Sequence, residues 1–263
     1  MHPVLFNIGS FNFPAYGFFC ALAYLVGILY ILRTTPEDKE KMSDILFYTI
    51  LSGLLGAKLF YVFTYWDSFG ADFAVRLKNV FLTFRYGFVF YGGFVGGTIG
   101  FFATARIKKI KPSAILDAMI PAVPLAHAIG RIGCFCAGCC YGAPTASVFG
   151  VRFTSTLSEV PPQLLGVPLH PVQLYESFGN LIIFAVLSVL YSKRKQLKLP
   201  VNSLVWLYAV LYSLLRFSLE FIRGDDRGGF FLSMSPAQNV SVIIIITALC
   251  LIPVIFNKKY ENK

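Results

Sequence analysis

Six ionisable side chains fall inside long apolar stretches of the sequence, where a charge is costly and is a functional-site hypothesis by default. They are Lys58, Asp117, Arg131, Glu176, Arg216 and Glu220. The guanidinium of an arginine presents a fork of donors that suits a phosphate, and the phosphate found at membrane depth is a phospholipid head group. Arg216 and Glu220 are four residues apart, so they share a helix face and could simply pair. The pattern predicts a phosphate-binding site, with internal ion pairing as the structural alternative.

Four of the six cysteines fall within seven residues, in the run CFCAGCC. They are Cys134, Cys136, Cys139 and Cys140. Three interpretations stay open for them: small packing residues, disulfides in an oxidising compartment, and thiol redox or metal chemistry. A zinc site usually takes its ligands from two separated pairs, and the chain has no second cysteine pair. His127 or His170 could complete a metal site, but the spacing does not show it, and no metal ion is predicted.

The elements that must position these side chains are long apolar blocks. The chain is 56% hydrophobic and only 14% charged, whereas a soluble domain is about 25% charged. A spanning helix needs roughly 20 mostly apolar residues, and the blocks are continuous runs rather than the alternating pattern of a membrane β-barrel. The sequence predicts an all-α polytopic transmembrane bundle of about seven spans, at residues 15–32, 45–65, 87–105, 113–130, 175–192, 201–222 and 238–256.

The distribution of Lys and Arg predicts the orientation of these spans. One set of alternate connections, which includes the tail from Asn257, holds 14 basic residues, and the other set holds 8. Because basic residues concentrate in cytoplasmic loops, the N-terminus is expected outside and the C-terminus in the cytoplasm. The net charge of +10 is explained in the same way, so nucleic acid is not an expected partner. One domain, 1–263, is expected, with a motif-bearing segment at about 131–174 outside the cytoplasm.

Short motifs along almost the whole chain resemble, in order, those of the prolipoprotein diacylglyceryl transferase family. The first half carries AYG with Tyr16, GAKLFYV, FYGGFVGG with Gly92 and Gly93, and Asp117 with Pro121. The second half carries Arg131, Gly133 and Gly142 of a glycine-rich signature, HPVQLYE with His170, Gln173, Tyr175 and Glu176, the set Arg216, Glu220 and Arg223, and MSPAQNVS with Gln238 and Ser241. The resemblance predicts membership of this family.

The resemblance implies an activity and a set of site residues. The family moves a diacylglyceryl group from phosphatidylglycerol to the lipobox cysteine thiol of a preprolipoprotein, at the bacterial cytoplasmic membrane. The implied partners are therefore phosphatidylglycerol, other membrane lipids and preprolipoprotein signal peptides, and no cofactor is expected. Arg131 and Arg216 are expected to clamp the lipid phosphate, with Glu220 orienting Arg216. Candidates for positioning or proton transfer are Tyr16, Tyr91, His127 and His170. Candidates for substrate binding are Gly92, Gly93, Gly133, Gly142, Gln173, Tyr175, Glu176 and Arg223.

Several positions depart from the family pattern. Tyr91 stands where the family has a histidine, which is the usual candidate for proton handling at the acceptor thiol. Cys134 and Ala137 replace two asparagines, and Cys139 replaces a glutamate. These changes leave an alternative open, in which the same scaffold is a membrane thiol-redox or metal-binding protein that uses the Cys134–Cys140 cluster. A lipid-binding or transport bundle without catalysis is the third interpretation.

Overall fold

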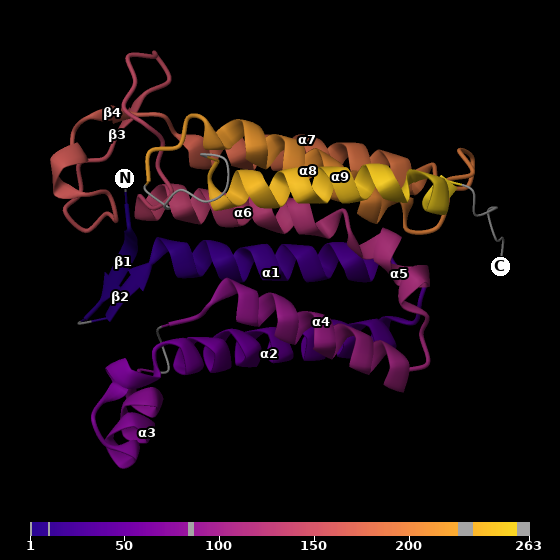
Figure 1. Cartoon of the computed structure of the whole chain (residues 1–263), viewed down its shortest axis with the longest axis horizontal. Coiled ribbons are helices and arrows are strands. Elements are labelled where there is room, and N and C mark those ends of the chain that lie inside the picture. The colour runs from indigo at the N-terminus through magenta and orange to yellow at the C-terminus, as the bar shows by residue number, and fades with distance from the viewer. Residues whose placement is uncertain (1, 10, 84–86, 226–233, 257–263) are drawn as a thin grey trace. The chain divides into compact units, whose positions relative to one another are not determined.

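The structure is a computed structural model that describes residues 2–9, 11–83, 87–225 and 234–256. The chain divides into two compact units (Figure 1). The first unit comprises Met1–Thr34 and Leu116–Lys263, and the second comprises Thr35–Ile115. Each unit is described by itself.

The second unit is built on two long helices that pack together, α2 (Lys39–Thr64) and α4 (Phe90–Ile107). The side chain of Asp38 caps α2 by accepting hydrogen bonds from the backbone N–H groups of Glu40 and Lys41. Between α2 and α4 lie a short 3₁₀ helix (Trp66–Phe69) and the amphipathic α3 (Phe73–Leu82). The sequence had been expected to form only a connection there, and the ten-residue α3 corrects that expectation.

Glycines allow α2 and α4 to approach closely. A Cβ atom added to Gly92 would lie 2.5 Å from the backbone oxygen of Gly56, and one added to Gly96 would lie 3.0 Å from the Cα of Gly56. We call this contact the glycine seam; it is formed by Gly53, Gly56, Gly92, Gly93, Gly96 and Gly97. Small residues at a helix contact bring the two backbones together, which is the common packing mode in membranes.

The first unit begins with a hairpin of β1 (Val4–Ile8) and β2 (Phe11–Pro14), which leads into α1 (Ala15–Thr34). The later helices are α5 (Pro112–Met119), whose first residues belong to the second unit, α6 (Ala122–Ala137), α7 (Val172–Ser192), α8 (Ser203–Glu220) and α9 (Pro236–Phe256). α6 packs on both α1 and α7, α7 packs on α8, and α8 packs on α9. The end of α6, the start of α7 and the end of α8 therefore lie at the same end of this unit (Figure 1).

The described chain is mostly helical and contains helices suited to a membrane, as predicted. Five helices, α1, α2, α7, α8 and α9, are long and apolar enough to cross a bilayer, and a sixth span results if α5 and α6, bent by 42°, count as one. Helix α4 covers another predicted span, but it is not among these five helices. Five of its 18 residues are glycines, which lower its mean hydropathy. The tail from Asn257, which the orientation prediction uses, lies outside the described residues.

The connection between α6 and α7 begins later than expected. A span was predicted to end at residue 130, but α6 continues to Ala137, so Arg131, Gly133 and Cys134 are helical. Gly138 ends the helix in the left-handed conformation, with φ of 82°. The connection then forms a two-stranded sheet of β3 (Val151–Arg152) and β4 (Pro168–Leu169) over a small core of Tyr141, Phe153, Val160 and Leu169.

Candidate functional site

Buried charged and polar side chains meet where α6, α7 and α8 adjoin. Glu176 of α7 is fully buried and accepts hydrogen bonds from Nη2 of Arg131 at 2.9 Å and from the hydroxyl of Tyr212 at 3.3 Å. Nε of Arg131 donates to Nε2 of His127, one turn earlier on α6, at 3.2 Å. We call these residues, together with Arg216 and Glu220, the polar cluster. A buried carboxylate is stable only when it is paired in this way.

Arg216 and Glu220 form an ion pair on α8, with Nη2 and Oε2 2.7 Å apart. Both side chains are more than nine-tenths buried. The spacing of four residues had suggested this pair, and the structure confirms it. Nη1 of Arg216 is also buried and has no hydrogen-bond partner among the described residues. The guanidinium therefore keeps a donor for another group.

Arg131 and Arg216 come from different helices but act on the same neighbours. Both charges interact with the imidazole of His127 and with the hydroxyl of Tyr212. Arg131 commits only two of its nitrogens to the described contacts, Nε and Nη2. The structure thus brings together the two arginines and the glutamates that the sequence selected. Tyr212 was missed, although it precedes Arg216 by four residues and so lies on the same helix face.

Backbone hydrogen bonds tie three distant segments together beside the polar cluster. The N–H of Gly142 donates to the carbonyl of His170 at 2.9 Å, and the N–H of Ala143 donates to that of Ile222 at 2.9 Å. The N–H of Gly224 donates to the carbonyl of Tyr141 at 3.1 Å. A side chain at Gly142 would collide with His170, with a Cβ distance of 2.6 Å, so glycine is needed there. We call this arrangement the backbone junction.

The backbone junction holds Arg223 and three thiols close together. The sulfur atoms of Cys134, Cys139 and Cys140 all lie within 4.8 Å of one another. Hydrogen bonds from the thiols of Cys134 and Cys139, together with the charges of Arg223 and Arg131, hold the pKa of the Cys140 thiol below its ordinary value. Burial acts to lower the pKa of Arg223, but its hydrogen bonds with Asp225 and Cys140 outweigh burial and raise that pKa.

Other predicted residues surround this group. Nε2 of the fully buried Gln173 donates to the carbonyl of Cys139 at 2.6 Å. Tyr16 interacts electrostatically with Cys134 and Cys139. His170 lies at the backbone junction with its ring centroid 6.2 Å from that of Tyr175. Gly133 packs α6 on α1, because an added Cβ would lie 2.9 Å from Phe19.

Tyr91, Gly92 and Gly93 belong to the second unit. The side chain of Tyr91 is 66% exposed. Gly92 and Gly93 are part of the glycine seam, and close packing against α2 accounts for both of them. Their role in substrate binding, like that of Tyr91 in positioning or proton transfer, stays a prediction.

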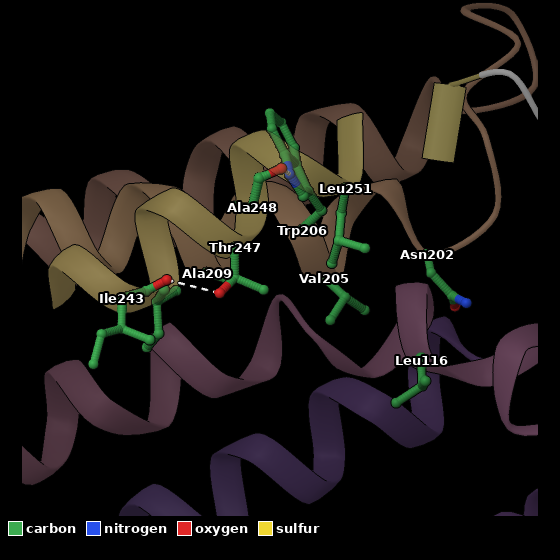
Figure 2. Close-up of a pocket in the computed structure, with 10 residues that line it drawn as sticks. Leu116, Asn202, Val205, Trp206, Ala209, Ile243, Thr247, Ala248 and Leu251 are labelled. Atoms are coloured by element: carbon green, nitrogen blue, oxygen red, sulfur yellow. Dashed lines mark hydrogen bonds between the residues drawn. The ribbon is translucent and has the colours of Figure 1, made fainter. Parts of the chain in front are cut away.

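A separate cavity of about 380 Å³ lies between α5, α8 and α9 (Figure 2). Its lining includes Leu116, Asn202, Trp206 and Ile243, and none of its ten lining residues is charged. Nε1 of Trp206 on α8 donates a hydrogen bond to the carbonyl of Ala248 on α9 at 2.7 Å. About ten residues of α8 separate Trp206 from Arg216, which is roughly 15 Å of helix. The cavity is therefore apolar and distinct from the polar cluster.

Apolar helices long enough to cross a bilayer, with two arginines that share polar neighbours at the end of one helical unit, define a multi-pass membrane protein with a charged cluster inside its helical bundle. The model of the family described as prolipoprotein diacylglyceryl transferase matches residues 3–254. The chain belongs to this family, as the motifs predicted.

Curated relatives match the chain over nearly its whole length. Phosphatidylglycerol–prolipoprotein diacylglyceryl transferase 2 of Clostridium perfringens is 32% identical over 254 residues, which are 95% of this chain and 94% of the relative. The corresponding transferase of Clostridium tetani is 32% identical over 258 residues, covering 95% and 96%. That of Dehalococcoides mccartyi is 31% identical over 255 residues, covering 94% and 91%. These relatives give no support to the alternative of a redox or metal-binding protein in place of a transferase.

Proposed function

We propose that this protein transfers a diacylglyceryl group from phosphatidylglycerol to the lipobox cysteine of a preprolipoprotein. The names of the relatives agree with this activity, which the motifs predicted. Its location is the bacterial cytoplasmic membrane, with seven spans, the N-terminus outside and the C-terminus inside. This topology places the polar cluster and the 131–174 segment at the outer face, and both units form a single transmembrane domain.

One observation carries the proposal: Arg131 and Arg216 act on the same two neighbours, His127 and Tyr212, from different helices. Each guanidinium keeps donors beyond its bond to a carboxylate, and Nη1 of Arg216 is buried without a described partner. The phosphate of one phosphatidylglycerol head group fits between two such forks. Glu176 and Glu220 hold the forks in place, so that little reorganisation is needed when the lipid binds.

The reaction needs an activated thiol and a stabilised leaving group. The acceptor thiol gives up its proton to solvent, its sulfur forms a bond to the glyceryl carbon, and the bond from that carbon to the phosphate oxygen breaks. The electron pair leaves with glycerol phosphate, whose added negative charge Arg131 and Arg216 stabilise in a water-poor site. Tyr16, Tyr91 and His170 are proposed to position the substrates.

The test is a transfer assay with the full-length protein in phosphatidylglycerol nanodiscs and a synthetic lipobox peptide. Arg131→Ala should lower kcat/KM by about 10²–10³-fold, which is typical of losing one preorganised donor to a developing negative charge. Arg131→Lys keeps the positive charge without the fork and should recover part of the loss. Full activity in Arg131→Ala would exclude Arg131 from the phosphate site.

A matched control separates this effect from the loss of any arginine. Arg33 is exposed and lies at the other end of α1 from Tyr16, so Arg33→Ala should keep the activity of the parent protein. Thermal unfolding of each variant shows whether a loss of activity is a loss of fold. A wild-type protein that makes no thioether product from phosphatidylglycerol would overturn the proposed activity.

A further inference from the structure

Three thiols meet at the end of α6 where the family pattern has polar side chains at two of the positions. The sulfur atoms of Cys134, Cys139 and Cys140 lie within 4.8 Å of one another, and all three residues are partly buried. No fourth His, Cys, Asp or Glu of the described chain brings a ligand atom into this group. The group is therefore a set of three soft donors.

The local backbone explains which cysteines take part. Cys134 lies on the last turn of α6, and Gly138 then reverses the chain so that Cys139 and Cys140 return beside it. Cys140 itself has a positive φ of 59°, a conformation that is strained for a residue with a side chain and that is often found at functional sites. Cys136 is two residues from Cys134 on the helix and so points elsewhere. Three of the four cysteines in the run therefore come together in the structure, and Cys136 does not.

Positive charge surrounds the three thiols. Arg131 interacts electrostatically with Cys134 and Cys140, and Arg223 interacts with Cys140. Three thiolates around a divalent cation carry a net charge of −1. The guanidinium groups of Arg131 and Arg223, each of which also pairs with a carboxylate, lie beside that charge and stabilise it. Gln173, fully buried, fixes the backbone of Cys139 through its carbonyl. The surroundings therefore suit an anionic tris-thiolate complex.

We propose that Cys134, Cys139 and Cys140 bind one Zn²⁺ ion whose fourth position receives the thiol of the acceptor peptide. The inference rests on the proposed function, because it assigns the activation of that thiol. Zinc prefers four tetrahedral ligands with Zn–S bonds of about 2.3 Å, which places the sulfur atoms about 3.8 Å apart. The three sulfur atoms reach this separation by shifts of about 1 Å or less. Soft thiolate donors select zinc over magnesium or calcium.

Such an ion would activate the acceptor thiol, for which the proposed function assigns no base. A thiol that coordinates Zn²⁺ gives up its proton to solvent and remains a nucleophile as the thiolate. Its sulfur attacks the glyceryl carbon, the bond from that carbon to the phosphate oxygen breaks, and the thioether product leaves the metal. Zinc undergoes no redox change. Tyr91 stands where the family pattern has a histidine, so the chain lacks that candidate base, and a metal-bound thiolate does not require one.

The position of Arg131 connects the two substrates. Arg131 interacts both with the polar cluster and with Cys134 and Cys140, so the thiol group adjoins the proposed phosphate site. An acceptor sulfur on the metal would therefore approach the glyceryl carbon from a point close to the leaving phosphate. Holding nucleophile and substrate together in this way lowers the entropic part of the barrier.

Metal binding is tested without turnover, on the reduced, metal-free, full-length protein in nanodiscs. Titration with Co²⁺ should give one ion per chain and a sulfur-to-cobalt charge-transfer band. Cys134→Ser and Cys139→Ser should weaken binding by more than the roughly 10–100-fold that loss of an outer-shell partner causes. Cys136→Ser is the matched control and should bind Co²⁺ as the parent protein does. The absence of the charge-transfer band, or an equal effect of all three variants, would overturn the site.

The acceptor position is tested with a synthetic lipobox peptide and its cysteine-to-serine counterpart. The cysteine peptide should shift the Co²⁺ spectrum, and the serine peptide should leave it unchanged. No shift with the cysteine peptide would overturn the role of the ion in activation. If the peptide shifts the spectrum but phosphatidylglycerol yields no product, the transferase proposal fails and the metal site stands. Full transferase activity of the metal-free protein would overturn the metal proposal and leave the proposed function intact.

Discussion

The polar cluster and the glycine seam are both made of motif residues on packed helices, but the two regions solve different problems. In the polar cluster, buried charges from three helices are paired, yet Nη1 of Arg216 keeps a free donor within the described chain. In the glycine seam, α2 and α4 meet through backbone atoms, with no side chain between Gly56 and Gly92. A motif in a membrane protein can therefore indicate chemistry or close packing, and the contacts of its residues distinguish the two.

The largest effect that would test this comparison is expected at Arg216. Arg216→Ala should lower kcat/KM by about 10²–10³-fold, because a donor to the leaving phosphate is lost, while the protein remains folded. The measurement is the transfer assay together with thermal unfolding of the same sample. If Arg216→Ala instead keeps its activity at the assay temperature while its unfolding temperature falls, Arg216 serves packing in the way that the glycine seam does.

A substitution in the glycine seam should lower the stability of the fold rather than act on the chemistry. A methyl group at Gly96 would collide with the carbonyl oxygen of Ser52, so Gly96→Ala should destabilise the fold by about 1–3 kcal/mol. Gly97→Ala is the control on the same helix, because its Cβ would meet its nearest atom, the Thr49 oxygen, at an ordinary 3.5 Å. Thermal unfolding in nanodiscs compares them. Equal stability of the two variants would show that close approach does not hold α2 and α4 together.

The smallest effect is expected for the hydroxyl of Tyr212, which donates to Glu176 at 3.3 Å. Tyr212→Phe should reduce activity about three- to tenfold, corresponding to roughly 1 kcal/mol for one hydrogen bond. Tyr208→Phe is the control, since Tyr208 stacks on Tyr212 with centroids 5.8 Å apart and its hydroxyl makes no hydrogen bond with another described residue. Equal activity of the two variants would mean that Tyr212 does not orient Glu176.

Local patterns in the sequence predicted much of this arrangement. Continuous apolar runs gave the positions of the long helices, because a bilayer requires that length. The spacing of four residues gave the pair of Arg216 and Glu220. The amphipathic α3 was missed because a ten-residue helix is too short to stand out as an apolar run.

Contacts between distant residues could not be predicted in this way. Arg131 and Glu176 are 45 residues apart, and no periodicity relates them. The sequence also did not predict that Cys134, Cys139 and Cys140 come together without Cys136. That arrangement depends on α6 continuing to the turn at Gly138 instead of ending at residue 130. Sequence reasoning therefore selected the charged residues of the polar cluster but could not give its pairing.

The backbone junction has a consequence for how this family can change. It joins Tyr141, Ala143 and Gly224 to their partners through main-chain hydrogen bonds, and these bonds do not depend on which side chains stand at Cys134 or Cys139. Mutation can then exchange asparagine or glutamate for cysteine nearby without dismantling the scaffold. The side chains beside the backbone junction can therefore diverge between members of the family while the fold stays the same.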